Sequence, residues 1–254
     1  MTLVEIPDRP FECKNLVADE WKDAASSERR EVLSPYTGKP VATVPLSSAT
    51  DVAAAARAGR EAAEQWRRVP IKERTQALFR YRELALRDLD ELASWVSLES
   101  GKTFAESRAG VLKGLEVTEL ALSLQNLDDG GALEVSRGVT CETRREPLGV
   151  VAGITPFNFP AMVPMWMFPI AITVGNAFIL KASEKVPVTA CRMGELMLEA
   201  GFPPGVFQLV HGQREAVEAI VDHDDVAAIG FVGSTPVAKQ VYARATSHGK
   251  RALA

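Results

Sequence analysis

The sequence predicts an α/β protein in which a largely helical segment precedes a doubly wound parallel sheet. Two patterns carry this prediction: apolar residues recur at helical spacing between residues 50 and 127, and short apolar strands alternate with helical stretches from Leu148 onward. The chain has 254 residues, of which 46% are hydrophobic, so it can bury the core of one large domain or of two small ones.

The first expected elements mix strand and helix. Residues 34–48 combine turn residues with short Val-rich stretches, which predicts a strand pair or an extended edge. Thr50 is placed to cap a helix over residues 51–69. A second helix is expected over residues 71–100, with Gly101 as its end.

A third helical stretch, residues 104–127, leads to a predicted turn over residues 128–131. Residues 138–145 then alternate in polarity between Gly138 and Pro147, as an exposed strand does. Such a strand has an edge that needs a partner.

From Leu148 onward, expected strands alternate with expected helices. The strands are expected in LGVVAGI, AFILKAS, VFQLVHG and AAIGFVGS. This alternation implies a parallel sheet with helices on both faces, and such sheets bind ligands beyond the carboxyl ends of their strands. The apolar run of residues 159–174 is shorter than the roughly 18 to 20 residues of a membrane span and is interrupted by prolines, so a buried, irregular helix is expected there and no membrane partner.

Composition also limits which classes of binding partner the chain is expected to have. The formal charge of −4, without a long block of like charge, argues against nucleic acid. The amino terminus resembles neither a secretory signal nor a transit peptide, so a cytoplasmic location is expected. Cys13, Cys141 and Cys191 show neither a CxxC pair nor a nearby His spacing, so we expect free thiols and no metal site.

The segments that follow the expected strands carry the candidate site: ITPFNFP, KASEK, HGQ and GFVGSTPVA. The usual dinucleotide fingerprint GxGxxG is absent. In the last segment, Gly233 allows close backbone approach, Ser234 or Thr235 can cap a helix, and Pro236 suits its first turn. The free N–H groups of that turn can hold an anion such as a pyrophosphate, although the same residues could simply start a helix.

Four other residues at strand ends have side chains that can take part in chemistry. Lys181 and Glu184 can both reach the hydroxyls of a ribose; the alternative is two solvated charges. Asn158, between two phenylalanines, can direct its amide N–H at an oxyanion; the alternative is ordinary turn chemistry. His211 has no paired Ser or Asp motif and is expected to be structural.

Taken together, ITPFNFP, GNAFILKASEK, HGQ and GFVGSTPVAKQVY have the order and spacing of the aldehyde dehydrogenase superfamily, which the chain resembles from about residue 30 to its end. YTGKPVATVPL, ELASWVSLESGKT and REPLGVVAGI extend the match upstream. PFNFPAMVPMWMFPIAITVGN and HGKRALA are most similar to the CoA-acylating branch that contains methylmalonate-semialdehyde dehydrogenase, and Phe157 stands where many hydrolytic relatives have Trp.

The resemblance implies a Rossmann-like fold that binds NAD, in an enzyme that oxidises a small aldehyde with CoA as co-substrate. It places Thr155 and Phe157 on the nicotinamide side and makes Asn158 an oxyanion-hole donor. It places the remaining cofactor contacts at Lys181, Glu184, Lys185, Gly233 and Ser234. NAD is favoured over NADP because Glu184 would repel a 2′-phosphate, partly offset by Lys181 and Lys185.

The implied domain plan assigns residues 1–136 and 147–254 to the NAD-binding domain and residues 137–146 to the strand arm of a homo-oligomer, expected to be a homotetramer. The nucleophilic cysteine of the family belongs to its second half, and none of the cysteines in this chain matches that motif. We therefore expect the catalytic domain to be absent from this chain, which would be a truncated copy and inactive alone.

Two features leave the activity open. The chain ends at KRALA, immediately before the position where hydrolytic members carry a general-base Glu and acylating members generally do not. Lys113 stands where acylating members usually have an Arg for the substrate carboxylate, and Lys cannot form the bidentate fork. The alternatives are a hydrolytic aldehyde dehydrogenase, a noncatalytic NAD-binding or subunit-docking fragment, and a truncated product that folds poorly.

Overall fold

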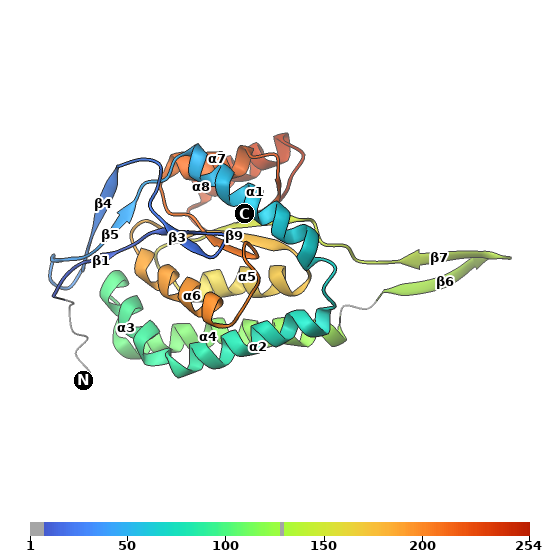
Figure 1. Cartoon of the computed structure of the whole chain (residues 1–254), viewed down its shortest axis with the longest axis horizontal. Coiled ribbons are helices and arrows are strands. Elements are labelled where there is room, and N and C mark those ends of the chain that lie inside the picture. The colour runs from blue at the N-terminus through green and yellow to red at the C-terminus, as the bar shows by residue number, and fades with distance from the viewer. Residues whose placement is uncertain (1–7, 128–129) are drawn as a thin grey trace.

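The computed structural model describes residues 8–127 and 130–254, and its centre is a seven-stranded sheet in the order β12-β11-β8-β9-β10-β2-β3 (Figure 1). The strands of this sheet are β2 (Asn15–Val17), β3 (Glu20–Lys22), β8 (Val150–Ile154), β9 (Ala177–Lys181), β10 (Phe207–Leu209), β11 (Val226–Phe231) and β12 (Arg251–Leu253). Strands β8 to β12 pair in parallel, whereas β2 and β3 are antiparallel. The predicted parallel sheet is confirmed, with three further short strands that the apolar pattern did not reveal.

Helices cover both faces of the sheet. They are α1 (Ala49–Trp66), α2 (Ile71–Arg87), α3 (Leu89–Ser100), α4 (Phe104–Ser123), α5 (Met162–Thr173), α6 (Pro187–Glu199), α7 (Arg214–Asp222) and α8 (Thr235–Ser247). Helices α1, α7 and α8 lie on one face, while α5 and α6 lie on the other with α2, α3 and α4 outside them (Figure 1). The apolar side chains form two buried clusters, one on each side of the sheet, as the doubly wound class requires.

The order of the strands creates a switch point. The chain runs from β8 through α5 to β9 and through α6 to β10, each strand beside the last. It then returns through α7 to β11, on the opposite side of β8. In sheets of this kind ligands bind at the carboxyl ends of the strands where the order reverses, which here means the ends of β8 and β11.

The beginning of the chain differs from the prediction. A second sheet contains β1 (Phe11–Glu12), β5 (Pro40–Pro45) and β4 (Arg29–Leu33), so only β5 of the expected pair lies within residues 34–48. Helix α1 has Ser48 as its N-cap, not Thr50. The Ser48 backbone N–H donates to the Asp51 carboxylate over 2.9 Å, and this capping box fixes the start of the helix two residues earlier.

The helix expected over residues 71–100 is two helices, α2 and α3, separated at Asp88 (φ −101°, ψ 22°). The Asp88 carboxylate accepts hydrogen bonds from Arg87 and Arg192, which hold the break in place. Helix α4 begins where expected and continues into a 3-10 turn, Leu124–Asn126. The predicted turn lies partly outside the described residues, at positions 128–129.

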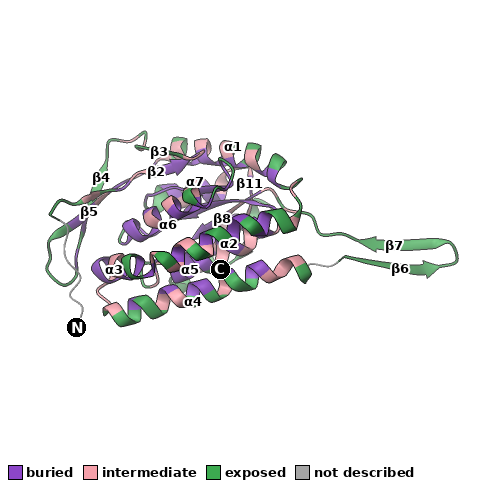
Figure 2. Ribbon diagram, turned by 60° about the horizontal axis from the view of Figure 1, so that its bottom comes forward, coloured by how far each residue is buried: buried purple, intermediate pink, exposed green. Residues whose placement is uncertain are grey.

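A two-stranded ribbon projects from the body of the protein (Figures 1 and 2). It consists of β6 (Gly131–Ser136) and β7 (Val139–Thr143), which pair antiparallel and are exposed at every residue. The exposed strand expected over residues 138–145 is therefore present as β7, and β6 is a partner that was not predicted.

The apolar run of residues 159–174 forms the buried helix α5 with Pro169 inside it, as expected. In the described part of the chain, no helix combines the length and apolar character that crossing a membrane requires.

Candidate functional site

The carboxyl ends of neighbouring strands are tied together at the switch point. The Thr155 backbone N–H donates to the Lys181 carbonyl over 3.1 Å, which joins the ends of β8 and β9. The Val232 N–H donates to the Ile154 carbonyl over 3.0 Å, which joins the ends of β11 and β8. The Val210 N–H likewise donates to the Leu180 carbonyl over 2.9 Å, at the ends of β10 and β9, so all four segments singled out in the sequence meet at one edge of the sheet.

A buried lysine forms the base of this edge. Lys181 is 5% exposed, and its Nζ lies 3.5 Å from the Glu184 Oε2. Burial lowers the pKa of Lys181, and the neighbouring Glu184 carboxylate opposes that shift. The alternative of two solvated charges is wrong for this pair. Arg30 from β4 adds a second cation, 3.7 Å from Glu184, and was missed because it lies 154 positions away in the sequence (184 − 30).

The segment after β8 presents one buried and two exposed side chains. Thr155 is buried, whereas Phe157 and Asn158 are exposed. The Lys185 Nζ lies 4.6 Å from the centre of the Phe157 ring, a cation–π contact that ties the segments after β8 and β9 together. Asn158 faces solvent in a turn, so both of its sequence interpretations remain compatible with its position.

The segment after β11 enters a helix whose first turn is exposed. Ser234 is the N-cap of α8 with extended backbone (φ −72°, ψ 145°), and its side chain makes no capping hydrogen bond. A Cβ atom at Gly233 would lie 2.5 Å from the ring of Phe231, so this position accepts only glycine without displacing that ring. The first-turn N–H groups of α8 are thus presented to an anion at the switch point.

An apolar groove between α7 and α8 was not predicted. Its cavity has a volume of about 660 Å³, within the range of small-molecule sites. Its apolar lining comes from residues one helical turn apart, Val217 with Val221 and Val237 with Val241. This spacing was visible in the sequence but is equally typical of core packing. Val237, which lines the groove, lies in the first turn of α8, three residues after Ser234.

Two further sequence candidates are Lys113 on α4 and His211 after the carboxyl end of β10. Lys113 is an exposed residue of α4 that pairs with Glu116 over 2.7 Å. His211 is fully buried, and its Nε2 lies 3.3 Å from the Cys191 sulfur. Among the described residues, no group of three or more His, Cys, Asp or Glu side chains is placed to hold a metal ion.

Known proteins share both the sequence and this architecture. The aldehyde dehydrogenase family profile matches residues 21–254. Malonate-semialdehyde dehydrogenase 3 of Geobacillus kaustophilus (strain HTA426) is 47% identical over 242 residues, covering 95% of this chain and 50% of that protein.

Solved structures agree with the sequence relatives. A methylmalonate-semialdehyde dehydrogenase structure from Sinorhizobium meliloti 1021, complexed with NAD, is 39% identical with a TM-score of 0.94, covering 97% of this chain and 50% of that one. The corresponding structure from Oceanimonas doudoroffii is 37% identical with a TM-score of 0.93, covering 95% and 50%. The chain spans about half the length of these relatives. Because the profile covers most of its residues, the chain belongs to the aldehyde dehydrogenase family.

Proposed function

We propose that this chain is the NAD-binding half of an NAD-dependent aldehyde dehydrogenase. The observation that carries the proposal is the backbone linkage of the strand ends that hold the Lys181–Glu184 pair and lead into the exposed N-terminus of α8, whose first turn also lines the α7–α8 groove. These three features are complementary to the hydroxyls, the phosphates and the base of a nucleotide, respectively.

The donor set fits the dinucleotide. Valines of the α7–α8 groove would enclose the adenine, and Lys181 and Glu184 would hydrogen-bond the adenosine ribose, with Lys185 near. Ser234 and the adjoining N–H groups would hold the pyrophosphate, close to the chain because Gly233 has no side chain. Thr155 and Phe157 would line the nicotinamide side.

We propose NAD in preference to NADP. Glu184 would repel a 2′-phosphate at the ribose, whereas Lys181 and Lys185 would attract it. The structure adds Arg30 to the cations beside Glu184. Lys181 and Arg30 therefore already offset the negative charge of this carboxylate. The discrimination between the two cofactors is therefore expected to be modest.

The complete protein would oxidise a small aldehyde to an acyl-CoA. A cysteine thiolate from the second half of the family's sequence would attack the aldehyde, NAD would accept a hydride, and CoA would take the acyl group from the resulting thioester. Asn158, exposed beside the end of β8, would donate its amide N–H to the oxyanion. Within this chain, Cys13 and Cys191 are buried and Cys141 lies on the ribbon.

Malonate or methylmalonate semialdehyde is the proposed substrate class, which the names of the relatives support. Lys113 would supply a positive charge for the substrate carboxylate, without the bidentate geometry of Arg. The partners of the complete protein would be the aldehyde, CoA and further copies of the subunit, which the projecting ribbon would contact.

Calorimetric titration of the chain with NAD tests the cofactor proposal directly. We expect one NAD per chain, and an apparent stability higher by about 2.7 kcal/mol when NAD is 100-fold above its dissociation constant. NADP should bind more weakly. A folded chain that shows no binding heat and no thermal stabilisation would refute the proposal.

The exposed ribbon favours a second candidate, a noncatalytic fragment that docks on a full-length relative. Neither candidate predicts NADH from aldehyde with this chain alone. Mixing the chain with a complete family member and measuring the molecular mass of the mixture tests the second candidate, because docking predicts a stable mixed complex.

A further inference from the structure

Two buried cysteines meet a buried histidine at the edge of the seven-stranded sheet. Cys13 lies in the loop between β1 and β2, Cys191 lies on α6, and both are 1% exposed or less. Each thiol is close enough to shift the pKa of the other, and the Cys191 sulfur lies 3.3 Å from the Nε2 of His211. The proposed cofactor site uses none of these three side chains.

The surroundings favour negative charge on one sulfur. Burial raises the pKa of Cys191, but the hydrogen bond with Cys13 and the neighbouring His211 outweigh burial and lower it, with help from the Lys14 backbone N–H. The hydrogen bond to Cys191, followed by burial, raises the pKa of Cys13. These opposite shifts favour ionisation of Cys191 over ionisation of Cys13.

The histidine is held so that one nitrogen faces the sulfur. The His211 backbone N–H donates to the Asn15 Oδ1 over 2.9 Å, and the Asn15 amide donates to the Ser47 hydroxyl over 2.8 Å. In the described part of the chain, the buried His211 Nδ1 has no hydrogen-bond partner. A core histidine that is merely structural would satisfy both nitrogens, so the contact with Cys191 is the distinctive one.

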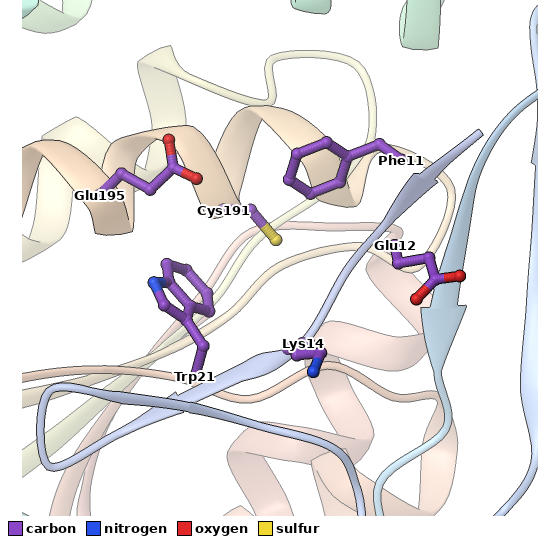
Figure 3. A pocket seen from close by; sticks show the side chains of 6 residues that line it. All are labelled: Phe11, Glu12, Lys14, Trp21, Cys191 and Glu195. Atoms are coloured by element: carbon purple, nitrogen blue, oxygen red, sulfur yellow. The ribbon is translucent and has the colours of Figure 1, made fainter. Parts of the chain in front are cut away.

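Cys191 borders a small cavity although only 1% of the residue is exposed. It lines a cavity of about 180 Å³, several times the roughly 30 Å³ that one water molecule occupies. Figure 3 shows the sulfur pointing into the space bounded by Phe11, Trp21 and Lys14, with Glu12 and Glu195 at its rim. The cavity is too small for a cofactor but admits a hydroperoxide.

We propose that Cys191 is a hydroperoxide-reactive thiolate and that Cys13 resolves it, forming a Cys13–Cys191 disulfide. The thiolate attacks the outer oxygen of the hydroperoxide, an S–O bond forms, the O–O bond breaks, and the alkoxide or hydroxide leaves and takes up a proton. Cys13 then attacks the sulfenic sulfur, an S–S bond forms and water leaves. Two thiols are oxidised to one disulfide while one peroxide is reduced.

Peptide mapping of the full 254-residue chain tests this reaction. In the Cys141→Ser variant, which removes the exposed thiol, we expect stoichiometric hydrogen peroxide to produce a cross-linked peptide that contains Cys13 and Cys191. The Cys13→Ser variant should stop at the sulfenic acid, which a dimedone-type reagent traps on Cys191. Persistence of both thiols in the folded Cys141→Ser protein would overturn the proposal.

The role of the histidine has its own readout. The His211→Asn variant should oxidise at least about tenfold more slowly near neutral pH, because less of Cys191 is thiolate without the imidazole. Gln213→Asn, an exposed change in the same loop, should leave the rate unaltered. Equal oxidation rates in the two variants, with thermal unfolding showing both to be folded, would contradict activation by His211. If His211→Asn does not fold, the cross-link in Cys141→Ser remains decisive.

Discussion

At the scale of single residues, Glu99 is a buried carboxylate, and burial disfavours its charged form. It lies on α3 and accepts hydrogen bonds from the backbone N–H groups of Val188 and Thr189, over 2.5 and 3.0 Å, and from the Thr189 hydroxyl over 2.7 Å. These contacts satisfy the first turn of α6 from another helix. Burial nevertheless raises the pKa of Glu99 to about 8.

This shift predicts how stability depends on pH. Between the ordinary value of 4.5 and about 8, the folded chain holds a proton on Glu99 that the unfolded chain has lost, so Glu99 makes the free energy of unfolding fall as pH rises through this window. Urea unfolding between these pH values should show a shallower pH slope in Glu99→Gln than in the parent chain. Glu31→Gln, an exposed change, should keep the parent slope; equal slopes in all three proteins would contradict the assignment.

Lys181 is the residue on which cofactor affinity should depend most. Lys181→Met keeps the buried stem and removes the ammonium, and Arg30 remains to neutralise Glu184. We expect the dissociation constant for NAD to rise about 10- to 100-fold, the equivalent of one lost hydrogen bond to a charged group. Calorimetry measures it, with the exposed Lys239→Met as the control. An unchanged dissociation constant for NAD in folded Lys181→Met would show that Lys181 does not contribute to NAD binding.

The strand-end residues could be predicted from the sequence because parallel strands must end at one edge. Lys181 and Glu184 follow directly from that rule. The role of Arg30 could not be predicted in this way, because its contact with Glu184 depends on where the separate β1-β5-β4 sheet is placed. The meeting of Cys13 with Cys191 had no local signal for the same reason, since it joins segments 178 positions apart (191 − 13).

At the scale of elements, the contact between α4 and α5 depends on a missing side chain. A Cβ atom at Gly114 would lie 2.5 Å from the Met165 Cε, 3.1 Å from the Met165 Cβ and 3.2 Å from the Met162 Cα. The terminal methyl of Met165 can move, but the backbone of α5 cannot move alone. Gly114 therefore sets how closely the two helices approach.

Gly110 provides a matched comparison one turn earlier in α4, since a Cβ atom there would meet nothing within 4 Å. Gly110→Ala should raise the free energy of unfolding by up to about 1 kcal/mol through helix propensity. Gly114→Ala gains the same propensity but should lower stability by about 1 to 3 kcal/mol through overpacking. Denaturant unfolding distinguishes the two. Equal effects would mean that α4 and α5 separate without cost.

Helix boundaries were predictable where a local cap fixes them. Thr103 accepts from the Glu106 N–H while the Glu106 carboxylate accepts from the Thr103 N–H, and α4 begins where the sequence predicts. The break at Asp88 was not predictable, because apolar spacing continues through it and the Arg192 that holds it comes from α6. At Asp88, the tertiary contact with Arg192 outweighs the helical spacing of the apolar residues.

At the scale of the whole molecule, the ribbon is the feature least explained by a single copy of the chain. Leu133, Val135 and Val139 are 68%, 56% and 52% exposed, although apolar strand residues normally cover a core. The outer edges of β6 and β7 also leave backbone groups available for a further strand. Pairing with another copy of the chain would cover both the side chains and an edge, as the oligomerisation arm of our proposal requires.

Charge on this ribbon should separate the copies. In Leu133→Lys/Val135→Lys, two like charges on β6 would oppose burial against a second subunit. Light scattering coupled to size exclusion should give an oligomer for the parent chain and 27.5 kDa for the double variant. Glu134→Gln is the control on the same strand, since its Oε1 can still accept from the Gly138 N–H. A parent chain of 27.5 kDa at micromolar concentration, or an oligomer unaffected by the lysines, would exclude the ribbon as the contact.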